Sequence, residues 1–315
     1  MKKMKKTGLL LLLLLLVSQI IIAEEQTSNE TGVTSSNELL LQASSQIEMK
    51  LGYMKRFTFP FLQGETPLTE SNNIGLNLGA QLSPISLNGF VEAVWTPIAF
   101  FQFAAGGGIG TGWNFEFFGE ENYGIGLNIE GASGKAEHDG NAFDGLLWKV
   151  QAGGALQADL AAIFPGDWNH VVLRSYHEIN YKGYTRAEKR DSWYFENDLG
   201  ENCNGLNYYG NLILGYQMPI FFDLFALLVE ANLYLYDTPD RSSWGDDKIQ
   251  WIFSAIMNFA ITKKIDVTVL TQFRTVRNYL EPNWEDLYYR NRTIDNSDPV
   301  SLKFYRVAAA LTYKF

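Results

Sequence analysis

The sequence predicts an all-β protein, an antiparallel, up-and-down transmembrane β-barrel of about twelve strands, with ten or fourteen as alternatives. Segment after segment alternates apolar and polar residues with the two-residue period of a strand. Beyond residue 23, no apolar run approaches the ~20 residues that a membrane-spanning helix needs. Aromatic residues make up 14% of the chain, and it contains 28 glycines. Such a composition is typical of a closed sheet, which can satisfy its backbone hydrogen bonds in lipid.

The segment 300–315 shows the alternation most clearly. One face would carry Tyr305, Val307, Ala309, Leu311 and Tyr313, and the other Arg306, Ala308, Ala310, Thr312 and Lys314. This strand resembles the closing strand of bacterial outer-membrane β-barrels, whose terminal aromatic residue and alternating apolar positions are read by the barrel-assembly machinery. The resemblance implies that Tyr313 and Phe315 form an assembly signal. It also implies that the assembly machinery and outer-membrane lipid are partners of the chain.

The first residues predict export. Residues 1–23 contain four lysines, then a leucine-rich apolar core that ends at Ala23. This is the pattern of a cleaved secretory signal peptide, and the apolar run is too short to favour a membrane anchor. Residues 24–45 are rich in Ser, Thr, Asn and Glu, which predicts a flexible periplasmic leader. The barrel is therefore expected over 46–315, in the outer membrane.

Alternation predicts eleven strands directly. They cover 46–57, 73–82, 86–95, 100–117, 145–162, 171–184, 206–218, 225–236, 249–261, 265–278 and 300–315. A barrel that starts and ends on the same side of the membrane needs an even number of strands. We therefore expect a twelfth strand, which we place within 55–69.

The connections between these strands differ in length. Short connections are predicted at 96–99, 164–169, 219–224 and 262–264, and long polar connections at 119–144, 185–205, 237–248 and 279–299. Outer-membrane barrels have short periplasmic turns and longer extracellular loops. The long connections are therefore expected outside the cell.

Charged residues within the strands predict which face turns inward. An Arg or Lys in the middle of the lipid-facing surface costs ~2–4 kcal/mol, so charges belong in the lumen. The candidate pore-lining residues are Glu92, Asp159, Arg174, Glu178, Glu230, Asp266, Arg274 and Arg306. Two interpretations remain open: the charges pair across a narrow interior, or they line a water-filled pore.

The sequence gives little support for an enzyme. Ser175 and His177 share the predicted lipid-facing side of one strand, as in outer-membrane lipases and deacylases. The order of the two residues is reversed relative to those enzymes, and the following Asn is missing, so lipase or deacylase activity is not expected. With one cysteine, Cys203, and three histidines, neither a metal site nor a cofactor is expected. A net charge of −10 gives no electrostatic basis for binding nucleic acid.

The leading functional prediction is a porin-like channel for small solutes. The alternative is a closed barrel whose long loops bind an extracellular ligand or act in adhesion. Conductance would support the first prediction, and loop-dependent binding without conductance would support the second. The excess of carboxylates on the predicted inner face further suggests a weak preference for cations. The oligomeric state is left open.

Overall fold

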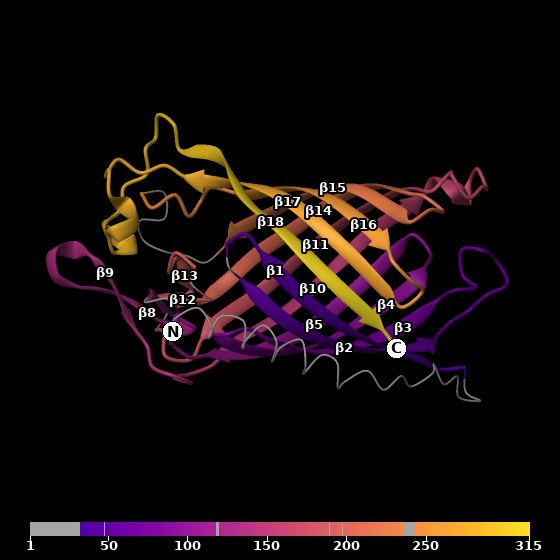
Figure 1. Cartoon of the computed structure of the whole chain (residues 1–315), viewed down its shortest axis with the longest axis horizontal. Coiled ribbons are helices and arrows are strands. Elements are labelled where there is room, and N and C mark those ends of the chain that lie inside the picture. Colours follow the sequence, from indigo (N-terminus) through magenta and orange to yellow (C-terminus); the bar gives the residue numbers. More distant parts are fainter. Residues whose placement is uncertain (1–31, 47, 118–119, 189, 197, 236–242) are drawn as a thin grey trace, which may run out of the picture.

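A computed structural model describes residues 32–315, except 47, 118–119, 189, 197 and 236–242. The predicted signal peptide, 1–23, lies outside the described residues. In the described part of the chain, twelve strands form one closed antiparallel barrel, as predicted (Figure 1). None of the helices in that part is long and apolar enough to cross a membrane.

Each barrel strand pairs with its neighbours along the chain, and β1 pairs with β18 to close the ring. The barrel strands are β1 (Thr34–Ser44), β2 (Met49–Pro60), β3 (Asn73–Leu82), β4 (Ser86–Ile98), β5 (Phe101–Gly112), β10 (Leu147–Asp159), β11 (Val171–Tyr184), β14 (Gly205–Gln217), β15 (Phe222–Tyr234), β16 (Gln250–Ala260), β17 (Ile265–Arg277) and β18 (Val300–Lys314). Closure leaves no strand edge of the described barrel unpaired, which is what a sheet needs in lipid.

The twelfth strand is β1, and it does not lie where we predicted. The range proposed for the missing strand, 55–69, instead holds the end of β2 and most of the connection 61–72 between β2 and β3. The prediction of a flexible leader over 24–45 is wrong for Thr34–Ser44. This segment pairs over seven residues with β18 and over ten with β2. The polar composition of this segment did not indicate a strand. Its strand conformation is stabilised by pairing with β18, which lies far away in the sequence.

The outer wall of the barrel is apolar. On β3 the residues Ile74, Leu76, Leu78, Ala80 and Leu82 alternate with Gly75, Asn77, Gly79 and Gln81. The first set faces outward and the second set faces the lumen, where Asn77 donates to Glu92. On β10 the outward side chains Val150 and Leu156 are 54% and 57% exposed. An apolar surface of this kind is stable when it contacts lipid.

The two ends of the barrel are built differently. At one end, here called the turn end, strands are joined by 99–100, 160–170, 218–221 and 261–264, and also by the longer connection 61–72. At the other, the loop end, the connections are 113–146, 185–204, 235–249 and 278–299, besides the short ones at 45–48 and 83–85. Figure 1 shows the long connections gathered at the left.

The long connections contain the remaining elements. These are β6 (Phe115–Phe117), β7 (Glu120–Asn122), β8 (Ile125–Glu130), β9 (Ala136–Asp139), β12 (Ser192–Phe195), β13 (Asn202–Cys203), and the 3-10 turns η1 (Ala132–Gly134), η3 (Trp284–Asp286) and η4 (Tyr289–Asn291); η2 (Leu160–Ala162) lies at the turn end. The strands β13, β12, β8 and β9 form a small sheet that joins two loops. Its core is Ile125 and Trp193, packed with Tyr184 of the barrel wall. We call the four packed long loops the cap.

Candidate functional site: the lumen and its cap

Glu92 lies at the centre of a chain of hydrogen bonds between inward side chains of four strands, β2, β3, β4 and β10. Its carboxylate accepts hydrogen bonds from Asn77 Nδ2 and Gln151 Nε2, both at 3.2 Å. Asn77 Oδ1 in turn accepts from Arg56 Nε at 2.9 Å. The register places Arg56, Asn77 and Glu92 opposite one another on the consecutive strands β2, β3 and β4. Gln151 of β10 reaches Glu92 past Gly106 of β5, which lies opposite both residues. The donors to Glu92 are neutral amides, so its negative charge is solvated but not cancelled.

Glu178 is the most buried of the predicted lumen carboxylates, with 4% of its side chain exposed. It accepts hydrogen bonds from Tyr176 Oη and Asn180 Nδ2, both at 2.9 Å. Lys149 Nζ on the neighbouring strand forms an ion pair with it at 2.7 Å. A buried carboxylate is tolerated when its lone pairs are satisfied and its charge is paired, and this one meets both conditions.

Two arginines face the same space without an ion pair. The Arg174 guanidinium lies 5.2 Å from the centre of the Tyr176 ring. Across the described residues, no carboxylate lies within ion-pair distance of Arg174 or Arg56. Both arginines therefore keep donors that can bind a polar solute or water.

These side chains line a polar cavity of about 500 Å³ inside the barrel. The lining includes Arg56, Asn77, Glu92, Arg174, Tyr176, Glu178 and Asn211, and it continues toward the turn end through Thr58, Asn73, Thr96 and Gln102. Asn211 Oδ1 is buried there and accepts no hydrogen bond from the described residues. The volume matches that of small-molecule sites, roughly 300–1,000 Å³.

The other predicted lumen residues do not join this cavity. Each makes its own local contacts: Asp159 with His170 Nδ1 at 2.6 Å, Glu230 with Tyr209 Oη at 2.8 Å, Asp266 with Lys314, Arg274 with the Tyr305 ring at 4.2 Å, and Arg306 with Gln272 Oε1 at 2.7 Å and with Glu48. Of the eight predicted residues, the structure brings together Glu92, Arg174 and Glu178.

Tyr305 differs from the predicted alternation. The pairing of β17 with β18 shifts here, because Gln272 lies opposite Arg306 whereas Phe273 lies opposite Phe304. Tyr305 is the extra residue of this bulge, and the guanidinium groups of both Arg274 and Arg306 stack on its ring. It is therefore packed against lumen arginines and does not continue the apolar row that includes Val307.

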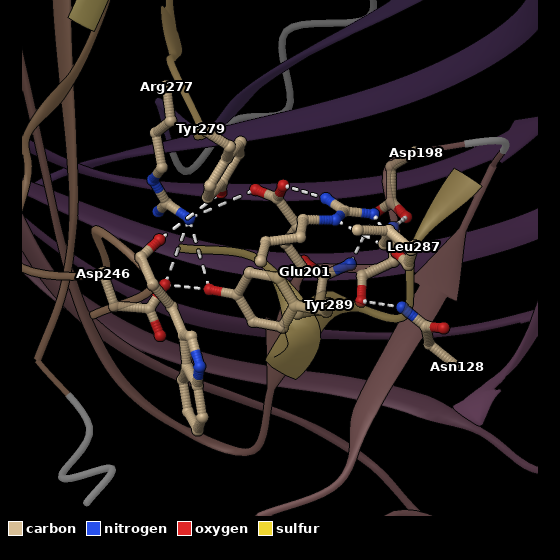
Figure 2. A network of polar contacts seen from close by, with 12 residues as sticks. Asn128, Asp198, Glu201, Asp246, Arg277, Tyr279, Leu287 and Tyr289 are labelled. Atoms are coloured by element: carbon tan, nitrogen blue, oxygen red, sulfur yellow. Dashed lines mark hydrogen bonds and ion pairs between the residues drawn. The ribbon is translucent and has the colours of Figure 1, made fainter. Parts of the chain in front are cut away.

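At the loop end, buried ion pairs hold the cap together (Figure 2). Arg277, the last residue of β17, pairs with Asp246 at 3.1 Å and with Glu201 at 3.3 Å. Arg292 pairs with the second oxygen of Glu201 at 2.8 Å. These residues come from β17 and three different loops, so the network joins loops 185–204, 235–249 and 278–299 to the wall.

Tyr289 completes this network. Its hydroxyl donates to Asp246 and accepts from Arg277 Nη1 at 3.2 Å. Burial raises the pKa of Tyr289 well above its ordinary value, so the hydroxyl keeps the proton that it donates. Asp246 and Tyr289 are both fully buried. A charge network enclosed in this way fixes the loops in one arrangement, because any separated member would be left buried and unpaired.

A second contact joins the cap to strands on the far side of the barrel mouth. Glu196, from the loop between β11 and β14, pairs with Lys50 on β2 at 2.5 Å and accepts from Ser86 Oγ on β4. In the ring of twelve strands, β2 lies six places from β14, on the opposite side. Glu196 has a left-handed backbone with φ of 53°, which costs free energy in a residue other than glycine. We call the Glu196–Lys50–Ser86 contact the clasp.

The prediction from sequence missed several residues of both sites. Arg56 and Tyr176 are polar residues at inward positions of recognised strands, and a full count of those positions would have found them. The sequence gives no comparable indication for the cap residues Glu201, Asp246 and Arg292, because residues in loops do not alternate between two faces. Across the described residues, no group of three or more His, Cys, Asp or Glu side chains could hold a metal ion.

Comparisons with known proteins find distant structural similarity alone. No family model and no curated protein matches the chain. Solved structures that resemble it include the KdgM porin (9% identity, 89% of this chain and 99% of that chain, TM-score 0.38) and the NanC porin (8%, 89% and 98%, 0.40). The outer membrane channel DcaP of Acinetobacter baumannii is a further example (10%, 93% and 100%, 0.31). The chain's class therefore rests on its own closed barrel with an apolar outer wall, and the structures it resembles are outer-membrane barrels.

Proposed function

We propose that the chain is a porin-like channel of the outer membrane that admits small hydrophilic solutes. The observation that carries this proposal is the polar cavity of about 500 Å³ enclosed by an apolar barrel wall. Guanidinium, carboxylate, amide and hydroxyl groups surround the space, and several of them have unused hydrogen-bonding capacity. Such a lining replaces the hydration shell of a polar solute, whereas it offers little to an apolar one.

The charged residues of the cavity change the cation preference that was expected from the sequence. Two arginines face two glutamates, and one of these glutamates, Glu178, is already paired with Lys149. The excess of carboxylates that favoured cations is therefore absent at this point of the lumen. We infer that passage through the cavity discriminates weakly by charge, and that size and hydrogen bonding decide which solutes enter.

The cap gives the channel its proposed restriction. Its clasp crosses the mouth at the loop end, so a solute has to pass between the loops and the wall or wait for the clasp to separate. With the loop end placed outside the cell, as in other barrels, the cap is the first barrier that an external solute meets.

Conductance of the purified protein in planar bilayers tests this proposal. We expect discrete single-channel openings of the wild type, with larger or more frequent openings when the clasp is removed by combining Glu196→Gln with Lys50→Gln. Swelling of protein-containing liposomes in sugars of increasing size should show a cut-off near the size of the cavity. Absence of conductance from both the wild type and the clasp variant, with folding verified by heat-modifiable gel mobility, would contradict a channel.

The alternative function also has an observation in its favour. Buried ion pairs and a shared sheet give the cap a fixed outer surface, which a binding module needs. A capped barrel that binds a ligand through its loops would show no conductance, and binding would be lost when the tip of loop 278–299 is altered.

A further inference from the structure

The outer wall of the barrel carries a chain of polar side chains at a place where lipid is expected. Ser175 Oγ lies 3.0 Å from His177 Nε2, and His177 Nδ1 lies 2.6 Å from Tyr208 Oη. Ser175 and His177 alternate with the inward residues Arg174, Tyr176 and Glu178 on β11, so they point away from the lumen. Polar groups in a membrane-facing wall are costly and generally mark a function.

Glycines on both sides leave His177 uncovered. Its cross-strand partners are Gly154 on β10 and Gly210 on β14. A Cβ on Gly210 would lie 2.6 Å from Tyr208 Oη and 3.4 Å from His177 Nδ1, so only glycine permits this contact without displacement. On the other side, a Cβ on Gly154 would lie 3.3 Å from the Gln102 carbonyl oxygen and 3.9 Å from the Phe101 and Phe103 rings, and His177 is not among its near contacts. The imidazole is therefore exposed on the outer wall, with no side chain directly opposite it on either neighbouring strand.

Apolar side chains surround Ser175 and His177 on the outer wall. The cross-strand partners of Ser175 are Leu156 and Leu212, which are 57% and 46% exposed. Leu173 and Ile179 lie on the same outward face of β11, before and after the polar pair. A molecule that contacts Ser175 would therefore place hydrocarbon against these leucines.

Each imidazole nitrogen of His177 has its own hydrogen-bond partner, and this arrangement allows His177 to act as a general base. When Nδ1 carries the proton and donates it to Tyr208 Oη, Nε2 is left with its lone pair directed at the Ser175 hydroxyl. A serine whose proton can pass to a neighbouring, oriented histidine is an activated nucleophile. Tyr208 acts through His177 and is a positioning residue.

Lipase or deacylase activity was not expected from the sequence, but the contacts of His177 with Ser175 and Tyr208 change that expectation. We propose that Ser175, His177 and Tyr208 form an esterase site on the outer wall that takes the acyl ester of a lipid. Ser175 Oγ attacks the ester carbonyl carbon while its proton moves to His177 Nε2. The C–O bond to the alcohol then breaks, and the alcohol leaves with that proton. Water, deprotonated by His177, attacks the acyl-serine, and the carboxylic acid is released as Ser175 recovers its proton. Each bond broken is matched by one formed, with water as co-reactant.

The position of Ser175 in its strand limits which lipids can react. It is the fifth residue of β11 from the turn end. With a rise of ~3.3 Å per residue and a tilt of ~40°, it lies roughly 10 Å from the end of the strand. The site therefore suits an ester group that reaches into the hydrocarbon region, in preference to one held at the membrane surface.

Covalent labelling tests the nucleophile. Folded protein in lipid vesicles would be treated with a long-chain alkyl fluorophosphonate, and the adduct would be located by peptide mass spectrometry. We expect phosphonylation of Ser175, with at least a ten-fold loss of labelling in His177→Gln. Ser35→Ala, which removes another wall serine, should label as the wild type does. An unlabelled Ser175 in folded wild-type protein would overturn the proposal.

Turnover tests the reaction and the role of Tyr208. Hydrolysis of p-nitrophenyl laurate should be lost in Ser175→Ala, and Tyr208→Phe should lower the rate and shift its pH profile, since the base loses its orienting partner. Tyr216→Phe is the matched control, because Tyr216 is an outward tyrosine of the same strand whose hydroxyl donates to Trp168 O. Equal hydrolysis by the wild type and Ser175→Ala would overturn the proposal. Both readouts are independent of conductance.

Discussion

The two halves of the lumen use the same twelve strands and the same kinds of polar residue in different ways. In the half toward the turn end, Arg56 and Arg174 surround a cavity and are left without ion pairs among the described residues. In the half toward the loop end, Arg277 and Arg292 are almost fully buried and each pairs with carboxylates. Arginine is available to a solute in the first half and serves as a structural connection in the second.

The difference follows from what surrounds each guanidinium. Strands alone leave space at the centre of a twelve-strand ring, so water solvates the charges there. Loops that fold back over the mouth remove that water, and a charge then has to be paired where it is buried. Loop packing therefore decides whether a charged side chain in the lumen interacts with solutes or holds loops in place. The alternation of residues along the strands does not predict this packing.

The largest expected effect concerns the buried network. Arg277→Met should destabilise the packed cap by about 3–5 kcal/mol, because Asp246 and Glu201 would remain buried without this partner. Hydrogen exchange should then rise in loops 235–249 and 278–299 while the barrel strands remain protected. Arg290→Met is the control, since Arg290 lies in the same cap but pairs with no carboxylate of the described residues. Unchanged exchange in Arg277→Met would mean that apolar packing alone holds the cap.

A smaller effect is expected at the clasp. The side chains of Lys50 and Glu196 are partly exposed, so their pair is worth about 1 kcal/mol. Glu196→Gln should therefore shift the balance between closed and open mouths by roughly five-fold. Single-channel open probability measures this shift, and a double-mutant cycle with Lys50→Gln isolates the pair. Additive effects of the two substitutions would contradict a direct clasp.

The smallest effect is expected in the cavity. Arg174→Gln should raise the ratio of cation to anion permeability by roughly two-fold, and the change should shrink as added salt screens the charge over ~10 Å or less. Reversal potentials in a salt gradient report the ratio. Arg274→Gln is the matched control, because Arg274 stacks on Tyr305 outside the cavity. A larger change for Arg274 than for Arg174 would place the selective region elsewhere in the lumen.

The sequence predicted the barrel wall well because the wall obeys a local rule. In β16 the outward Trp251, Phe253 and Ala255 alternate with inward polar residues such as Ser254, and the period is visible without any partner. β1 was missed because Glu38-Leu-Leu-Leu-Gln42 interrupts the alternation, and its strand conformation depends on β18, more than 260 residues away.

The polar contacts were less predictable because they depend on register. Tyr208 lies 31 residues from His177, and only the alignment of β11 with β14, with Gly210 opposite His177, reveals the contact between them. Likewise, Glu201 and Arg277 are 76 residues apart and meet because loop 185–204 folds back onto the end of β17. A residue list can name such side chains as polar, but it cannot say which of them touch.

The clasp also has a mechanical consequence. A thin-walled tube resists stretching along its wall, yet it flattens easily when squeezed from the side. The contact from the β11–β14 loop to β2 spans nearly the full width of the ring, and it therefore acts as a strut against flattening along that diameter. At the turn end, the ion pairs of the described residues join near neighbours, Asp159 with His170 and Asp266 with Lys314. Lateral pressure from a crowded membrane would thus deform the cavity end into an ellipse before it deforms the capped end.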